Sequence, residues 1–280
     1  MSLAHVLLLV AAGAHAPAAD TVVQASPGDR LVVAELSGAV VITSWDRDAI
    51  EVAGADRDDD LAVRRSGSEL RVGYAERVRR GRPVEGRIRV PRWMAIEIGS
   101  RSLDLSIRGV DGDVRVGTID GDVRVDDAGG FVEVRTIRGD VFVTNARGGV
   151  RASSQGDDVT IRGAEGPIEA HSGDGDVLLE DVRSASVRVE AQDGDVTFEG
   201  AIQPGGSYGF FVHDGDAVLA LPAGTDARVS VSTFDGDFQS EFPVRLDRFS
   251  SGRAFEFVLG SGSAQIQIEV FDGEIHLLER

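Results

Sequence analysis

Aspartates recur at a fixed interval in the second half of the sequence, and no other pattern in it looks as much like a chemical site. The series is Asp122, Asp140, Asp158, Asp176 and Asp195, with spacings of 18, 18, 18 and 19 residues, and it continues to Asp216 and Asp237. If the fold stacks these residues into one Asp column, their carboxylates repel unless backbone N–H groups or a cation neutralise them. Hard cations such as Ca²⁺ favour clustered oxygen ligands.

Two interpretations of the Asp column remain open. In the first, the five carboxylates are metal ligands for Ca²⁺, the only cofactor that the sequence suggests, with help from neighbouring acids. Those neighbours are Asp120, Asp174, Asp193 and Asp235. In the second, each Asp bonds nearby backbone in a tight turn, the usual role of Asp beside Gly. We expect Ile119 and its repeats to help fill the core, and loops of that kind are poorly suited to enclosing an ion, so the sequence favours turn chemistry.

A second row of side chains, in the middle of alternate predicted strands, is a candidate interface. Its members are Arg124, Phe142, Thr160, Leu178 and Thr197. Phe and Leu exposed on a flat sheet can dock a partner or a second copy of the chain, although isolated exposed apolar residues are also ordinary.

An arginine-rich stretch contrasts with the acidic chain and is a candidate site for phosphate-bearing envelope polymers. It comprises Arg77, Arg79, Arg80, Arg82, Arg87, Arg89 and Arg92. The alternative is a solvated hairpin whose charge is balanced by Asp56, Asp58, Asp59 and Asp60.

Residues with the spacing of a catalytic site are not found. The histidines after the leader, His171, His213 and His276, lack metal-ligand spacing, and no Gly-x-Ser-x-Gly elbow occurs. Tryptophan and tyrosine, which line the grooves of polysaccharide-acting solenoid enzymes, lie outside the regular repeats. We therefore predict no enzymatic activity and keep a polysaccharide-acting enzyme as a remote alternative.

A nine-residue repeat explains how these rows are positioned. Pairs of apolar residues separated by one residue, half of them Val-x-Val, begin at positions 114, 123, 132, 141, 150, 159, 168, 177, 187 and 196, and glycine stands two positions before most of them. Alternation with period two is typical of a strand with one buried face, and nine residues leave room for a turn but not for a helix. A third inward residue is expected at each corner. These residues are Ile119, Ala128, Ile137, Ala146, Ala164 and Val182.

The charges between the paired valines indicate that two repeats make one coil. In every second repeat they are Arg115, Glu133, Arg151, Glu169 and Arg188. The sign alternates at each step, which suits stacked parallel strands about 4.8 Å apart. The sequence therefore predicts an all-β protein, a parallel β-solenoid with about 18 residues per coil.

Three segments are expected along the chain. Residues 1–18 have the apolar run and small residues of a signal peptide. Residues 19–100 contain short alternating segments and are predicted to form a β region that caps the solenoid, which occupies residues 101–280. We expect the C-terminal edge near Ile275 to be less protected than the N-terminal end.

Composition limits the partners. The chain of 280 residues has a formal charge of −18 and no cysteine, which disfavours nonspecific nucleic-acid binding and excludes disulfides. No later apolar run is long enough for a transmembrane segment in the mature chain. We expect an exported protein, periplasmic or at the cell surface, whose partner is a protein or glycan of the envelope. Self-association through a face or an end of the solenoid is a further option.

Several motifs resemble a bacterial family of β-strand-repeat proteins that are described as adhesins, a domain of unknown function. They are Gly38 to Trp45 followed by Asp46, the segment 88–91, the Thr-x-x-Gly-Asp-Val repeats at Thr118 and Thr136, and the closing segment 271–275. The resemblance implies a solenoid-like β fold at the cell envelope, with no catalytic residues to assign. Together with the repeat it predicts a non-catalytic adhesin-like or scaffold module, with a Ca²⁺-dependent solenoid as the alternative.

Overall fold

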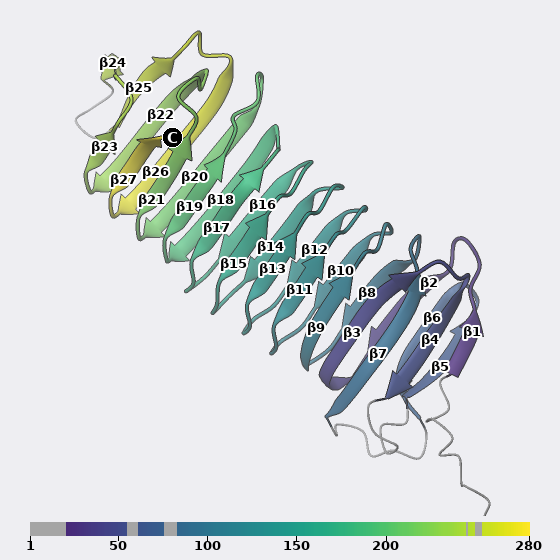
Figure 1. Ribbon diagram of the computed structural model, residues 1–280. Helices are drawn as coiled ribbons and strands as arrows, with labels where there is room; N and C mark the ends of the chain where they lie inside the picture. The colour runs from purple at the N-terminus through teal and green to yellow at the C-terminus, as the bar shows by residue number, and fades with distance from the viewer. Residues whose placement is uncertain (1–20, 55–60, 76–82, 245, 250–253) are drawn as a thin grey trace, which may run out of the picture.

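The computed structural model describes residues 21–54, 61–75, 83–244, 246–249 and 254–280, and the expected signal peptide lies outside these residues. The described chain forms two long sheets that face each other along an elongated solenoid (Figure 1). The predicted all-β parallel solenoid is confirmed. No helix that could cross a membrane occurs in these residues.

Sheet A has thirteen strands in the described residues. In spatial order they are β1 (Thr21–Gln24), β4 (Ala49–Gly54), β7 (Val84–Pro91), β3 (Ser37–Trp45), β9 (Ser102–Arg108), β11 (Val123–Asp126), β13 (Val141–Thr144), β15 (Val159–Arg162), β17 (Val177–Val182), β19 (Val196–Gly200), β21 (Ala217–Leu221), β27 (Ile275–Glu279) and β23 (Phe238–Ser240).

Sheet B has fourteen strands in the same residues. In spatial order they are β24 (Leu246–Phe249), β25 (Ala254–Leu259), β22 (Ala227–Asp235), β26 (Ala264–Asp272), β20 (Ser207–Asp214), β18 (Ser186–Asp193), β16 (Ile168–Ser172), β14 (Val150–Ser154), β12 (Val132–Arg135), β10 (Val114–Gly117), β8 (Ala95–Gly99), β2 (Arg30–Ala34), β6 (Glu69–Tyr74) and β5 (Leu61–Ser66).

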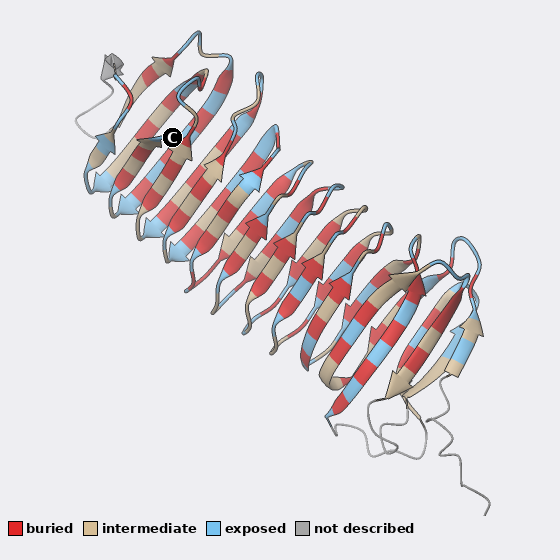
Figure 2. Cartoon of the chain, in the orientation of Figure 1, coloured by how far each residue is buried: buried red, intermediate tan, exposed pale blue. Residues whose placement is uncertain are grey.

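The regular coils follow the predicted 18-residue period. Val114 pairs with Val132 in sheet B, and Val123 pairs with Val141 in sheet A. The paired inward residues are buried along every regular strand, so that buried and more exposed residues alternate (Figure 2). Burying one valine contributes about 1.5–3 kcal/mol, and each coil adds several to one continuous core.

The charge ladder also lies where the spacing places it. Arg115 pairs in register with Glu133, and Arg151 with Glu169. The side chains of these pairs approach to 3.6 Å and 2.7 Å. Exposed pairs of this kind contribute less than about 1 kcal/mol each, so the ladder favours this register without dominating stability.

The two corners of a coil are built differently. After the sheet A strands, Asp127 and Asn145 adopt the left-handed conformation, with φ of 55°. This conformation turns the next residue inward, and Ala128 and Ala146 are buried as predicted. Asp and Asn accept this φ more readily than other side chains do.

At the other corner, the expected inward isoleucines are a wrong prediction. The strand alternation continues past the end of the strand, so Thr118 and Thr136 are buried. Ile119 is only half-buried, and Ile137 is 47% exposed. A threonine can occupy this corner because its hydroxyl donates to a backbone carbonyl two residues ahead, at 2.8 Å from Thr118 and 3.1 Å from Thr136.

Both ends of the solenoid reverse the order of their coils. The coil of β2 and β3 lies between that of β6 and β7, which follows it in sequence, and that of β8 and β9. At the other end, β26 and β27 lie between the coil of β20 and β21 and that of β22 and β23. The expectation of a poorly protected edge near Ile275 is therefore wrong, because β23 pairs with β27.

Antiparallel strands complete each end. At the N-terminal end, β5 pairs with β6 and β4 with β7, while β2 and β3 continue the two parallel sheets. At the C-terminal end, β25 pairs antiparallel with β22, and β24 with β25. The division between a cap and a solenoid at residue 100 stays a prediction.

Candidate functional site

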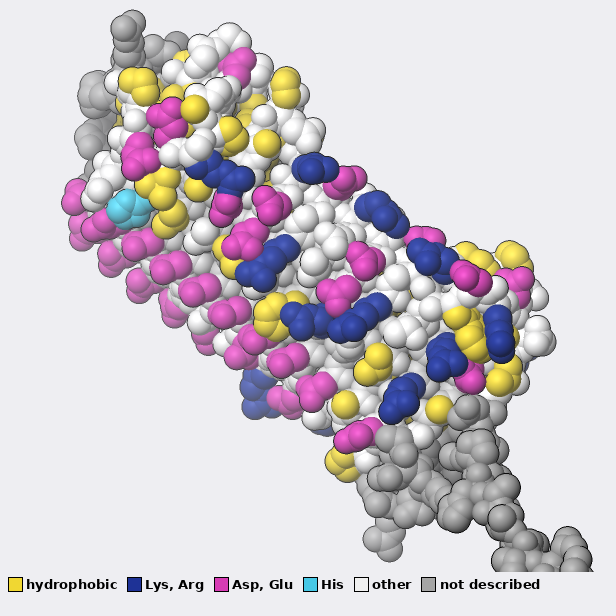
Figure 3. All heavy atoms as spheres, in the orientation of Figure 1, with side chains coloured by type: hydrophobic (Ala, Val, Ile, Leu, Met, Phe, Trp, Pro, Cys, Tyr) yellow, Lys and Arg dark blue, Asp and Glu magenta, His cyan; other side chains and the backbone are white. Residues whose placement is uncertain are grey.

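The predicted Asp column lies along one long edge of the solenoid, where acidic side chains form a line (Figure 3). Each carboxylate accepts a hydrogen bond from the backbone N–H of the corresponding Asp in the next coil. The N–H groups of Asp140, Asp176 and Asp195 donate to the Oδ1 atoms of Asp122, Asp158 and Asp176, at 3.0, 2.9 and 2.9 Å. The carboxylates thus connect neighbouring coils instead of bonding within their own turn.

The column includes two acids that were not assigned to it from the sequence, Asp104 and Glu274. Asp104 begins it by accepting from the N–H of Asp122, at 3.2 Å. Near the C-terminus, the N–H of Glu274 donates to Asp216 at 2.8 Å. Glu274 therefore stands between Asp216 and Asp237, because the strand order is reversed at this end. The sequence could have indicated this position of Glu274, because Gly273-Glu274-Ile275 matches the Gly-Asp-Val pattern of the repeats with Glu in place of Asp.

Glycines beside the column allow the coils to approach. A Cβ atom on Gly139 would lie 2.2 Å from the carbonyl oxygen of Gly121, and the φ of Gly139 is 135°. Only glycine avoids both the collision and the strain of this positive φ. The Gly-Asp pair therefore serves the stacking of the coils.

The predicted Ca²⁺ site remains a prediction. Among the described residues, no group of three or more His, Asp or Glu side chains converges as a metal site would require. Burial raises the pKa of Asp140, and the neighbouring carboxylates Asp122, Asp158 and Asp157 raise it further, against the hydrogen bond from the N–H of Asp158. The carboxylates repel one another here while their Oδ1 atoms already accept N–H donors.

The predicted interface row lies in register across sheet A, in β11, β13, β15, β17 and β19. Its apolar members are not freely exposed. Phe142 and Leu178 are half-buried, and the Arg124 guanidinium lies over the Phe142 ring, 5.0 Å from its centroid. A docking role for this row stays a prediction.

Of the arginine-rich stretch, Arg87, Arg89 and Arg92 lie in the described residues, and the other four arginines lie outside them. Arg89 pairs with Glu51 at 2.8 Å, and Arg92 pairs with Asp111 at 3.4 Å. Their charges are therefore partly neutralised. The balancing acids at 56 and 58–60 also lie outside the described residues.

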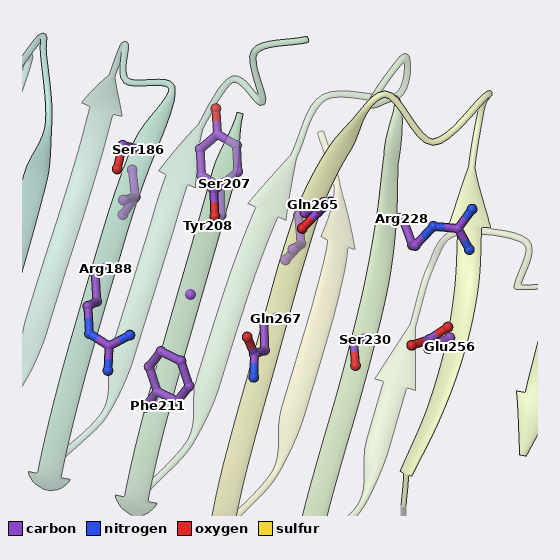
Figure 4. A pocket seen from close by; sticks show the side chains of 13 residues that line it. Ser186, Arg188, Ser207, Tyr208, Phe211, Arg228, Ser230, Glu256, Gln265 and Gln267 are labelled. Carbon is purple, nitrogen blue, oxygen red and sulfur yellow. The ribbon is translucent and has the colours of Figure 1, made fainter. Parts of the chain in front are cut away.

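A hollow that the sequence did not indicate lies on the outer face of sheet B, near the C-terminal end. Its volume is about 520 Å³, and it crosses β18, β20, β26, β22 and β25 (Figure 4). Two rows of residues in register form most of its lining. They are Ser186, Ser207, Gln265 and Arg228 in one row, and Arg188, Gly209, Gln267, Ser230 and Glu256 in the other.

Glycine and aromatic side chains shape this hollow. Gly209 has no side chain between Arg188 and Gln267, which lowers the floor over β20. The Phe211 ring packs over Gly209, where a Cβ atom on Gly209 would lie 2.8 Å from the Cε2 atom of Phe211. The Arg188 guanidinium lies 4.5 Å from the centroid of the same ring, and it also pairs with Glu190 at 2.5 Å. These contacts hold Phe211 as one wall of the hollow.

Much of the polar lining is uncommitted. The side chains of Arg228 and Glu256 make no hydrogen bond or ion pair with any described residue, and neither do the hydroxyls of Ser186, Ser207 and Ser230. Most of these groups are exposed, so water satisfies them in the free protein. They are available to a ligand without first breaking a protein contact.

An aromatic ridge adjoins the hollow on the same sheet face. It consists of His213, Phe271 and Phe234, whose rings stack in succession with centroids 4.9 Å and 4.7 Å apart. Phe271 is 47% exposed and Phe234 59% exposed. Exposed apolar residues gathered in this way mark interaction surfaces more often than single ones do. A second depression of about 410 Å³ separates the ridge from Phe211.

A protein-family model covers most of the chain. Residues 30–278 match the model of the Toastrack DUF4097 family, a bacterial domain of unknown function. A search of curated proteins gives no match.

Solved structures similar to the chain include two candidate adhesins. The one from Bacteroides fragilis NCTC 9343 is 14% identical, with 93% of this chain and 96% of that chain covered and a TM-score of 0.44. The one from Parabacteroides distasonis ATCC 8503 is 12% identical, with 94% and 96% covered and a TM-score of 0.41. Since its family model spans nearly the whole chain, the protein is a member of the Toastrack DUF4097 family.

Proposed function

We propose that the protein is an exported, non-catalytic, adhesin-like module that binds a component of the cell envelope through the C-terminal part of sheet B. The observation that carries this proposal is the hollow beside the aromatic ridge, where uncommitted polar groups and exposed rings share one rigid face. The leader-like segment at 1–18 and the absence of catalytic spacing in the sequence agree with it.

The solenoid suits this role because it holds the surface residues on paired strands. Sites on strands are positioned more precisely than sites on mobile loops. β20, β26 and β22 are consecutive in sheet B, and their hydrogen-bonded ladders fix the rows that line the hollow. A ligand would meet a preformed surface, which lowers the cost of ordering on binding.

The test is co-sedimentation of the purified protein with insoluble envelope material from the bacterium that produces it. The double substitution Phe234→Ser/Phe271→Ser removes the ridge at exposed positions, so the fold should persist while binding weakens at least tenfold. Phe142→Glu on sheet A is the matched control and should bind like the unmodified chain. Loss of binding by Phe142→Glu alone, with both variants folded, would place the surface on the predicted sheet A row instead.

A further inference from the structure

The hollow has the chemistry of a site for sugars. Serine hydroxyls and glutamine amides can each donate and accept hydrogen bonds, as the hydroxyls of a glycan do. Ser207, Ser230 and Gln265 make no side-chain hydrogen bond with a described residue. The lining also continues across five strands (Figure 4), or roughly 19 Å at about 4.8 Å per strand. An extended chain of sugar units can occupy such a length.

A peptide fits the hollow less well. Peptides commonly bind sheets by adding a strand to a free edge, but β20 and β26 lie inside sheet B with neighbours on both sides. Their backbone N–H and C=O groups are already used in the ladders. The outer face of the sheet offers side chains alone, which favours a ligand that bonds through its own substituents.

The hollow holds one uncommitted cation and one uncommitted anion, Arg228 and Glu256, and the cation offers a contact to an acidic ligand group. Arg228 has no ion-pair or hydrogen-bond partner among the described residues, and its planar guanidinium suits bidentate binding of a carboxylate. The Asp column passes this coil just beyond Asp193, at the end of β18. Asp193 is five residues along the strand from Arg188, or roughly 16 Å at about 3.3 Å per residue. That exceeds the screening length of about 8 Å at physiological ionic strength, so the column does not prevent local binding of an anion.

Phe211 supplies an apolar contact within the same hollow. Its ring is held between Gly209 and the Arg188 guanidinium, and the C–H groups of a sugar ring can pack against an aromatic wall. We propose that the hollow binds a carboxylate-bearing glycan laid across the strands, with Arg228 binding the carboxylate and Phe211 packing against the sugar. This inference rests on the proposed function, since it names the ligand class of the same surface.

The test measures the affinity of the full chain for probes that separate the two recognised groups. Polygalacturonate, alginate and hyaluronate carry both hydroxyls and carboxylates. Methyl-esterified polygalacturonate carries hydroxyls without the charge, and poly-L-glutamate carries carboxylates without hydroxyls. Titrations in chelator-containing buffer should show at least one polyuronate binding ten times more tightly than both single-feature probes.

Variants assign the binding to the hollow. Arg228→Gln should lower affinity for the polyuronate at least tenfold and abolish the preference over the ester. Gly209→Ala should also weaken binding, because the added methyl displaces the far end of the Phe211 side chain while leaving the backbone unstrained. Arg183→Gln, at a 78% exposed arginine outside the hollow, is the matched control and should bind normally.

Three results would overturn the inference. They are equal binding of the ester, equal binding of poly-L-glutamate, and no binding of any polyuronate. Each leaves the envelope-binding test readable, because that test uses the natural envelope material and the ridge variant. Loss of both kinds of binding would reject the proposed function together with this inference.

Discussion

At the scale of single residues, Asp140 shows the cost of stacking carboxylates. Its pKa is raised by burial and by three neighbouring acids, so the folded state disfavours its charged form. A group that binds its proton more tightly in the folded than in the unfolded state makes the fold less stable as pH rises. Below its ordinary pKa, Asp140 is protonated in both states and does not destabilise the fold. As pH rises through the raised pKa of the folded state, its charge lowers the stability.

Asp140→Asn should therefore be as stable as the unmodified chain at pH 7, or more stable by roughly 0.5 kcal/mol, since like charges on a partly exposed surface contribute modestly. An Asn oxygen can still accept from the N–H of Asp158. Urea unfolding at pH 7 and at pH 4 measures the difference, which should shrink at the lower pH. A variant less stable at pH 7 would show that the charge itself is needed.

A double substitution in the Asp column tests the hypothesis that the column binds Ca²⁺. Thermal unfolding in millimolar Ca²⁺ and in chelator should give the same midpoint, because the Oδ1 atoms of the column already accept backbone donors. A higher midpoint in Ca²⁺ that disappears in Asp140→Asn/Asp158→Asn would instead establish the column as a cation site.

At the scale of the element, the side chains at the corner of the coil contribute unequally to the free energy of unfolding. Ile137→Ser should change the free energy of unfolding by less than about 0.5 kcal/mol, because Ile137 is half exposed. Thr136→Val keeps the shape but removes the hydroxyl bonded to the Arg138 carbonyl, and it should cost about 1 kcal/mol. Urea unfolding of both variants tests which of the two adjacent residues of this corner belongs to the core. A larger loss in Ile137→Ser would mean that the isoleucine is the core residue.

The periodicity of the sequence predicted most features of the coil. The valine spacing and the alternating charges at Arg115 and Glu133 predicted strands, register and coil length, because a one-residue shift would bury charged groups. The corner at Ile137 was predicted wrongly since apolar character alone cannot show where alternation stops. The Asp column was placed correctly, but its hydrogen bonds to the next coil depend on the stacking distance.

At the scale of the whole molecule, the reversed coil order at both ends could not be predicted from the local pattern of apolar residues. β26 and β22 meet only because the chain returns from the last coil. Arg228 and Gln267 come from different passes of the chain, so their common hollow has no sequence spacing. Gly209 and Phe211 belong to the hollow only through their neighbours in sheet B.

The central claim is that the ligand surface is the C-terminal part of sheet B, and footprinting tests it most directly. Hydroxyl-radical labelling, with and without the envelope material, reports the accessibility of individual phenylalanines. We predict protection of Phe211, Phe234 and Phe271 on binding, with Phe142 unchanged. Protection of Phe142 without protection of the ridge would contradict the account and move the binding surface to sheet A.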